Sequence, residues 1–454
     1  MSTPPLASGP QGPDALRPLL HTVLDALTTG ATARGGPLPA GGPQHVARAL
    51  RDQAGDLLPA HGDPNALHDL VHALAQGAAD PADPLCTAHL HCPPLAVATA
   101  ADLAASALNP SLDSWDQAPA ASELEALLTR TLAHEIYDTP HSDALITTGG
   151  TESNQLALLL AREAHGGTQL VCAASAHHSL HRAAWLLGLP EPVVLPAPAG
   201  TLDPAALDNA LTTLHGPLLV AATAGTTDAG LIDPLPDIAD LCATHGARLH
   251  IDAAYGGGLL LSEQHRAKLR GLDRAHTITL DLHKLGWQPV AAGLLAVRDP
   301  ADLTPLTHHA DYLNAHDDTE AGLPDLLGRS LRTTRRPDAL KIAVTLKTLG
   351  RDGLATLVDQ VCAHAHHLAD LITDHPGFEL YDRPAISTVL FRPTGATDDT
   401  VAAIRRTLLD QGHAVLGRAT LDGRRWLKAT LLNPHTQPGD LATLLKLVEG
   451  HTPR

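Results

Sequence analysis

The stretch TLDLHKLGWQPVAAG, residues 279–293, joins an apolar, strand-like run to a histidine and a lysine. His283 and Lys284 follow the point where the strand should end, and the residues after them are small or apolar with no further charge. An ammonium group in such surroundings costs free energy unless water or a carboxylate compensates its charge. Lys284 must therefore be solvated, paired with a carboxylate or involved in a reaction, and other sequence motifs indicate which of these roles it has.

Short apolar runs alternate with helical patterns on both sides of this stretch, from about residue 85 to about residue 300. We expect helices over residues 152–165, 179–187 and 236–245, and strands at ALITT, QLVCAAS, PVVLP, PLLVAAT, ARLHIDAA, HTITLDLH and AGLLAVR. Strands and helices that alternate at this spacing predict a largely parallel α/β sheet with both faces covered.

The two ends of the chain lack this regular alternation of strands and helices. Residues 1–14 are rich in Pro, Gly and Ser and are expected to be disordered, and two short helical patterns follow them. Beyond about residue 330, one long helical pattern (338–374), two strand candidates (387–392 and 425–432) and two amphipathic helices (398–411 and 438–448) indicate an α+β unit. We therefore expect a disordered tail and helical arm at 1–80, a large domain at 81–330 and a small α+β domain at 331–454.

Composition narrows the function classes. The formal net charge of −18 argues against nucleic acid or an anionic membrane as the main partner, because phosphates would be repelled. No stretch approaches 18 uncharged apolar residues, the first residues lack a signal-peptide pattern, and the 5 scattered cysteines do not form a disulfide framework. We expect a cytoplasmic protein with reduced cysteines. The 29 histidines match a compositional bias, so an isolated histidine carries little weight.

Three local patterns together indicate a cofactor. TTGGTESNQLALLLAR (147–162) places two glycines and Thr151 where a strand passes into a helix, which is typical of an anion site but also of a capped turn. HIDAAYGGG (250–258) ends a strand in Asp252, and Lys284 follows a second strand end 284 − 252 = 32 residues later. A phosphate cradle, a carboxylate and a lysine are what pyridoxal 5'-phosphate requires.

The chain resembles the group II pyridoxal-phosphate-dependent amino acid decarboxylases. The motifs TGGTESN, SAHHSLHRAA, ATAGTTDAGLIDPL, HIDAAYGG, LDLHK and DYLN occur in the order and spacing of that family. The resemblance covers roughly residues 80–450. It implies a fold type I large domain of the aspartate aminotransferase kind with a mostly parallel seven-stranded sheet, and a homodimer in which the amino-terminal arm takes part.

The resemblance also assigns roles to individual residues. Lys284 matches the lysine that binds the cofactor covalently, and Asp252 matches the aspartate that keeps the pyridine nitrogen protonated. His177 matches the histidine that stacks on the cofactor ring. The remaining cofactor contacts that it implies are Gly150, Thr151, Thr227, Asp281 and His283. Asp281 stands where some relatives carry Asn.

Tyr312, in the motif DYLN, matches the tyrosine of a mobile loop that returns a proton after carbon dioxide leaves. The charged run around it, NAHDDTEAGLPD, suits a lid that excludes water. Relatives that instead convert the substrate to an aldehyde with oxygen typically lack this tyrosine. A packing role for Tyr312 is the structural alternative.

The substrate is less constrained than the reaction. SLDSWDQ (111–117) and residues 317–341 look most like the branch that acts on diaminobutyrate, ornithine or lysine in siderophore or polyamine synthesis. Asp113 or Asp116 is a candidate partner for a distal ammonium group, with Asp116 preferred, and Cys92 matches a position on the substrate side. An aromatic amino acid or histidine decarboxylase, an oxidative deaminase and a catalytically silent scaffold remain alternatives. CTAHLHC (86–92) lacks a second ligand cluster, so no metal is expected.

Overall fold

The structure is a computed structural model in which residues 3–452 are described. These residues divide into two compact units, which are considered separately. One unit joins the segment up to residue 93 with residues 364–383 and the segment from residue 388 onward, and the other contains residues 94–363 and 384–387. The division into regions 1–80, 81–330 and 331–454 stays a prediction.

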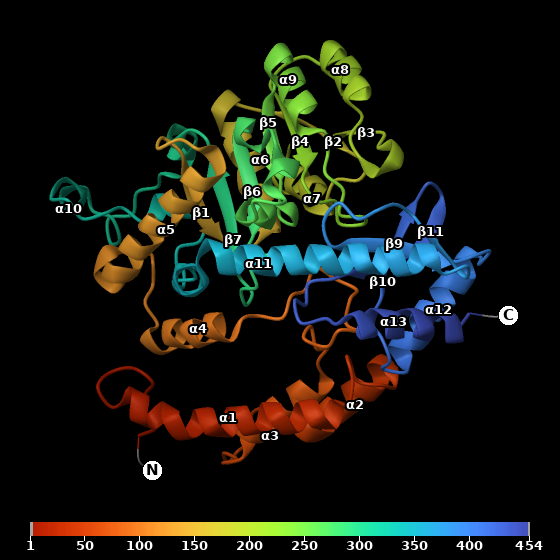
Figure 1. Cartoon of the computed structure of the whole chain (residues 1–454). Helices are drawn as coiled ribbons and strands as arrows, with labels where there is room; N and C mark the ends of the chain where they lie inside the picture. The colour runs from red at the N-terminus through yellow and green to blue at the C-terminus, as the bar shows by residue number, and fades with distance from the viewer. Residues whose placement is uncertain (1–2, 453–454) are drawn as a thin grey trace. The chain divides into compact units, whose positions relative to one another are not determined.

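The second unit is built on a sheet with the strand order β1-β7-β6-β5-β4-β2-β3 within the described residues (Figure 1). β2, β3, β4, β5 and β6 pair in parallel, whereas β7 runs antiparallel to both β6 and β1. The strands are β1 (Asp143–Thr147), β2 (Gln169–Ala173), β3 (Val193–Leu195), β4 (Leu218–Thr223), β5 (Arg248–Asp252), β6 (Thr277–Asp281) and β7 (Gly293–Val297).

Helices cover this sheet on both faces. α6 packs across β1, β7, β6 and β5, and α9 packs against β4 and β5. His250 and Asp252 of β5 point toward α6, so the alternate residues Leu249 and Ile251 point to the other face. The helices are α4 (Ala96–Leu108), α5 (Pro119–Tyr137), α6 (Gly150–His165), α7 (His178–Leu186), α8 (Pro204–Thr213), α9 (Leu235–His245), α10 (His316–Glu320) and α11 (Ala339–Asp374), which continues into the first unit.

Burial explains the sequence of the strands. All six residues of β4, LLVAAT, are buried, as expected for a parallel strand with helices on both of its faces. Short 3-10 helices complete the connections, namely η1 (Trp115–Gln117), η2 (Pro198–Gly200), η3 (Gly256–Leu261), η4 (Arg266–Leu269), η5 (Leu272–Arg274), η6 (Pro300–Leu306) and η7 (Leu327–Arg329).

The first unit contains the amino-terminal helices and an antiparallel sheet of order β10-β11-β9-β8. α1 packs along α3, and a Cβ at Gly30 would lie 2.6 Å from the carbonyl oxygen of His72, so this close approach requires glycine. β10 alternates buried and exposed residues because one of its faces is solvated. The elements are α1 (Gly12–Arg34), α2 (Gly42–Ala54), α3 (Ala66–Gly77), β8 (Phe378–Leu380), β9 (Thr388–Pro393), α12 (Asp398–Asp410), β10 (Gly417–Leu421), β11 (Arg424–Thr430) and α13 (Pro438–Gly450).

The mostly parallel seven-stranded sheet and the small carboxyl-terminal sheet that the sequence predicted are confirmed. Every strand expected between residues 85 and 300 forms. The structure adds elements that the sequence patterns did not predict, namely α3, α4, α5, α8, α10, β8 and β10. No helix among residues 3–452 is both long and apolar enough to cross a bilayer.

Candidate active site

Three parallel strands end next to one another at one edge of the large sheet. The register pairs Thr223 of β4 with Asp252 of β5, and Asp252 with Thr279 of β6. In open α/β sheets, ligands bind in the crevice beyond the carboxyl ends of the strands. The polar residues that follow β5 and β6 therefore lie where a ligand is expected.

Lys284 lies in the turn after β6 and is paired. Its Nζ is 2.9 Å from Oδ2 of Asp281, and the two side chains are 19% and 3% exposed. Nε2 of His283 lies 3.5 Å from the same carboxylate oxygen. Burial lowers the pKa of His283, so its imidazole is neutral near neutral pH.

Two glycines at the start of α6 pack closely against this cluster. Gly149 has a φ of 151°, and a Cβ there would lie 2.9 Å from Cε1 of His283. A Cβ at Gly150 would lie 3.1 Å from Cβ of Ala254 and 3.3 Å from Oδ2 of Asp281. Only glycine therefore fits at these two positions, and it lets the amino terminus of α6, with its free N–H groups, pack closely against His283 and Asp281.

Asp252 ends β5 with its carboxylate almost fully buried, at 5% exposure. Oδ2 accepts a 2.8 Å hydrogen bond from Nδ2 of Asn154, and Oδ1 accepts one of 3.1 Å from the backbone N–H of Ala254. Both donors are neutral. The free-energy cost of burying a carboxylate is offset when a cation faces it. A protonated ring nitrogen of a bound molecule would supply that charge.

His177 caps the amino terminus of α7. Its Nδ1 accepts a 3.3 Å hydrogen bond from the backbone N–H of Ser179 and lies 2.8 Å from Oγ of the same serine. The His178 ring lies 4.2 Å from the His177 ring, centroid to centroid. Burial lowers the pKa of His177, and the Asp252 carboxylate opposes that effect.

The sequence analysis missed three buried residues that touch this site: Asn154, Ser179 and His250, each with no exposed surface. Asn154 bonds both Asp252 and Ser179, and His250 lies 3.0 Å from Oδ1 of Asn154. For two of these residues, Asn154 and His250, the spacing in the sequence contained a signal. Asn154 follows Gly150 by one helical turn, and His250 precedes Asp252 by two strand positions, so each shares a face with a residue already assigned.

Other predicted residues lie in exposed positions or outside this unit. The side chains of Thr151, Thr227 and Asp116 are exposed on α6, the loop after β4 and η1, respectively. Cys92 is buried and belongs to the first unit.

Tyr312 is 83% exposed on the segment that leads to α10, which projects away from the sheet in Figure 1. The segment folds around Asn314, whose Oδ1 accepts from the N–H of Ala310 and whose Nδ2 donates to the carbonyl of His308, both at 2.8 Å. The structure therefore does not bring Tyr312 to Lys284, and a proton-donating role would require the segment to take another position or to act on another chain.

The residues fit pyridoxal 5'-phosphate on two observations. Glycine at 149 and 150 leaves the first N–H groups of α6 uncovered by side chains of their own residues, and Oδ1 of Asp281 is buried without a hydrogen-bond partner among the described residues. Lys284 and Asp252 would hold the aldehyde end and the ring nitrogen. When bound, the cofactor supplies an aldehyde for the lysine and a ring that accepts an electron pair.

Comparison with known proteins agrees with this geometry. The family model described as the pyridoxal-dependent decarboxylase conserved domain matches residues 48–394. The chain is 42% identical over 403 residues to an L-2,4-diaminobutyrate decarboxylase of Rhizobium meliloti (strain 1021), covering 85% of this chain and 80% of that protein. It is 33% identical over 399 residues to an L-2,4-diaminobutyrate decarboxylase of Acinetobacter baumannii, covering 80% and 78%.

A solved structure extends the similarity to nearly the whole chain. It is the glutamate decarboxylase domain of diaminobutyrate-pyruvate transaminase and L-2,4-diaminobutyrate decarboxylase from Vibrio parahaemolyticus, with a TM-score of 0.87 and 31% identity over 98% of this chain and 97% of that chain. The fold is therefore fold type I, the cofactor is pyridoxal 5'-phosphate, and the activity class is amino acid decarboxylation. The chain belongs to the pyridoxal-dependent decarboxylase family.

Proposed function

We propose that this enzyme converts L-2,4-diaminobutyrate to 1,3-diaminopropane and carbon dioxide. The observation that carries the proposal is the 42% identity to the Rhizobium meliloti L-2,4-diaminobutyrate decarboxylase over 85% of the chain. The net charge of −18 also favours a substrate that bears a second ammonium group. Ornithine and lysine are the nearest alternatives, and an aromatic amino acid or histidine ranks below them.

The contacts described above support the roles proposed for Lys284, Asp281, Asp252 and His177, whereas the role of Tyr312 is taken from the resemblance. Lys284 binds the cofactor and later releases the product, and Asp281 holds its ammonium group in place between these events. Asp252 faces the ring nitrogen with its carboxylate, which keeps that nitrogen protonated. His177 lies against the ring as a neutral imidazole, and Tyr312 donates a proton to the carbon that has lost its carboxylate.

Three residues are proposed as contacts for the substrate. Asp116 and Cys92 are the residues assigned from the resemblance, and Asp113 is the alternative to Asp116. Asp113 is 8% exposed and accepts a 2.7 Å hydrogen bond from Nε2 of Gln117, whereas Asp116 is exposed. A buried carboxylate gains more from a substrate ammonium than an exposed one does, which favours Asp113. A cytoplasmic location and a siderophore or polyamine context complete the proposal.

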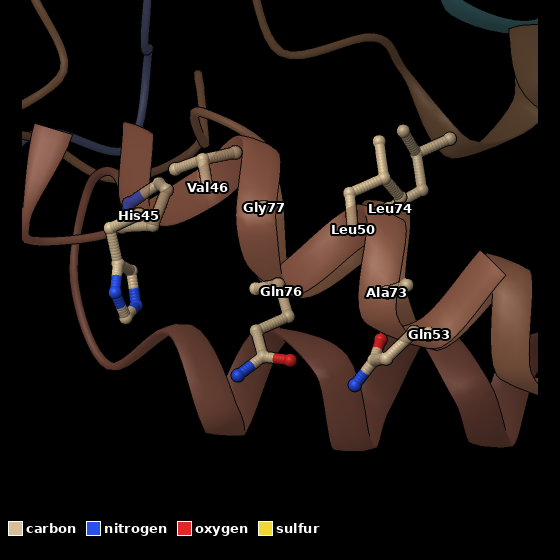
Figure 2. Close-up of a pocket in the computed structure, with 10 residues that line it drawn as sticks. His45, Val46, Leu50, Gln53, Ala73, Leu74, Gln76 and Gly77 are labelled. Carbon is tan, nitrogen blue, oxygen red and sulfur yellow. The ribbon is translucent and has the colours of Figure 1, made fainter. Parts of the chain in front are cut away.

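We also propose that the enzyme is a homodimer whose amino-terminal helices are covered by a second copy. The helices α1, α2 and α3 expose many leucines, among them Leu24 at 59% and Leu74 at 66%. Leu50 and Leu74 line one apolar pocket of about 90 Å³, and Figure 2 shows them pointing to the same side of α2 and α3. Exposed apolar area of this extent on adjacent helices is typical of an interface.

The substrate proposal predicts the products of an incubation. Holoenzyme is incubated separately with L-2,4-diaminobutyrate, ornithine, lysine, histidine, tryptophan or glutamate, and the amine released from each is measured by chromatography. The release of 1,3-diaminopropane from L-2,4-diaminobutyrate should be the fastest of the six reactions. Lys284→Ala should lose at least about three orders of magnitude in rate, because the covalent link to the cofactor is lost. Lys347→Ala, which removes an exposed lysine of α11, is the matched control and should keep full rate. Faster release of another amine would replace the proposed substrate.

The role of Tyr312 predicts a change of product. Tyr312→Phe keeps the ring but removes the proton donor, so amine formation should fall by about a hundredfold or more. An aldehyde and ammonia should then form in the presence of oxygen, and both are measured with the amine in one assay. An unchanged rate of amine formation in Tyr312→Phe would rule out the proton-donating role.

The dimer predicts a change of mass. Light scattering coupled to gel filtration should give twice the 47.3 kDa of one chain. The double variant Leu24→Glu, Leu74→Glu should shift toward the monomer, because charged residues cannot be buried in an apolar interface. Leu186→Glu, an equally exposed leucine on α7 of the other unit, is the control and should remain dimeric. A wild-type monomer, or a double variant with unchanged mass, contradicts the proposal.

A further inference from the structure

Asn154 occupies the centre of a buried hydrogen-bond network behind the site. Its Nδ2 donates to Oδ2 of Asp252 at 2.8 Å and to Oγ of Ser179 at 2.9 Å. Its Oδ1 accepts from Oγ1 of Thr279 at 2.9 Å and lies 3.0 Å from Nε2 of His250. A primary amide has two N–H donors and two acceptor lone pairs, so all four are used.

Chemistry fixes the direction of these bonds. A carboxylate only accepts hydrogen bonds, so the NH₂ group of Asn154 must face Asp252 and its oxygen must face His250. Nε2 of His250 then carries the hydrogen, and Nδ1 accepts from Oγ1 of Thr277 at 2.9 Å. Burial lowers the pKa of His250 to about 4, which agrees with a neutral ring. Protonation of His250 therefore does not disturb the network near neutral pH.

The same amide sets the tautomer of His177 through one hydroxyl. Because Oγ of Ser179 accepts from Asn154, the serine's own hydrogen is available for Nδ1 of His177, 2.8 Å away. The backbone N–H of Ser179 points at the same nitrogen from 3.3 Å. Two donors at Nδ1 favour the neutral imidazole with its hydrogen on Nε2 and oppose protonation at Nδ1.

We propose that Asn154 is a positioning residue that acts on two residues of the cofactor site, Asp252 and His177. It orients the Asp252 carboxylate toward the ring nitrogen directly, and through Ser179 it keeps the His177 imidazole neutral and with its hydrogen on Nε2. The inference rests on the roles proposed above for Asp252 and His177. It adds that these two residues are coupled through one side chain, so that a change at Asn154 alters the acid–base behaviour of a histidine it does not touch.

The charged groups that face His177 come from each element around it. Asp252 at the end of β5 and Asp281 at the end of β6 favour its protonation, whereas His178 on α7 and Lys284 after β6 oppose it. None of these is changed by a substitution at Ser179. A shift in the titration of His177 in such a variant would therefore report the lost hydroxyl.

The test measures cofactor affinity as a function of pH. The dissociation constant of pyridoxal 5'-phosphate from the apoprotein is determined by equilibrium dialysis between about pH 5 and pH 8.5, the range in which histidine titrates. A cationic imidazole against a cationic ring is repelled, so affinity should fall as the pH drops through the pKa of His177. Wild type, Ser179→Ala, Asn154→Ala and a control are compared.

Ser179→Ala removes the hydroxyl donor but keeps the bond between Asn154 and Asp252. The neutral imidazole loses one hydrogen bond, so the midpoint of the acid fall should move upward by about half to one pH unit, with affinity at high pH little changed. Asn154→Ala keeps the serine hydroxyl but no longer orients it, so its midpoint should shift in the same direction by a smaller amount. In addition, affinity should be lower by about ten- to a hundredfold at every pH, because Asp252 loses a donor.

Ser387→Ala is the matched control. Ser387 is as fully buried as Ser179, and its hydroxyl bonds the hydroxyl of Tyr255 at 2.9 Å, outside this network. It should keep the wild-type midpoint. Identical midpoints in Ser179→Ala and wild type, or in Asn154→Ala and wild type, would overturn the inference. If Asn154→Ala does not fold, Asn154→Ser takes its place, because its shorter side chain also loses the bonds to Asp252 and Ser179. Wild-type protein that binds the cofactor without an acid midpoint would instead overturn the roles proposed for Asp252 and His177.

Discussion

The ion pair between Lys284 and Asp281 is the interaction on which the site depends. An amine held 2.9 Å from a carboxylate that is 3% exposed is fixed in direction, and it is only partly open to water. The pairing explains how a lysine can follow a buried strand without destabilising the fold.

The parallel sheet gives this pair its neighbours. β5 and β6 are adjacent and parallel, so Asp252 and Asp281 leave the sheet at the same edge. α6 begins at that edge with Gly150 and crosses β6 and β5, which brings Asn154 against Asp252. Strand order, glycine at the helix start and one asparagine a turn later thus place an amine, a carboxylate and the amino terminus of a helix at one edge of the sheet. The chemistry of the cofactor requires that combination.

Much of this arrangement could be predicted from the sequence, because its signals are local. Apolar runs bounded by helical patterns predicted every strand of the large sheet, and the ends of two of them predicted Asp252 and Lys284 as neighbours. The buried network could not be predicted in the same way. Asn154, Ser179 and His250 look like ordinary residues of a helix, a cap and a strand, and their roles appear only when three elements pack together. Two short strands, β8 and β10, also lacked a strong pattern, since one is only three residues long and the other has a solvated face.

The position of Tyr312 could not be predicted from the sequence. Tyr312 was assigned from its motif, but its segment folds around Asn314 and exposes the ring. The most direct measurement of the central claim concerns Lys284 itself. Holoenzyme is reduced with borohydride, digested and examined by mass spectrometry for a pyridoxyl group. The account predicts that the group is on Lys284, and a label on another lysine, or none on a protein that turns over its substrate, would contradict it.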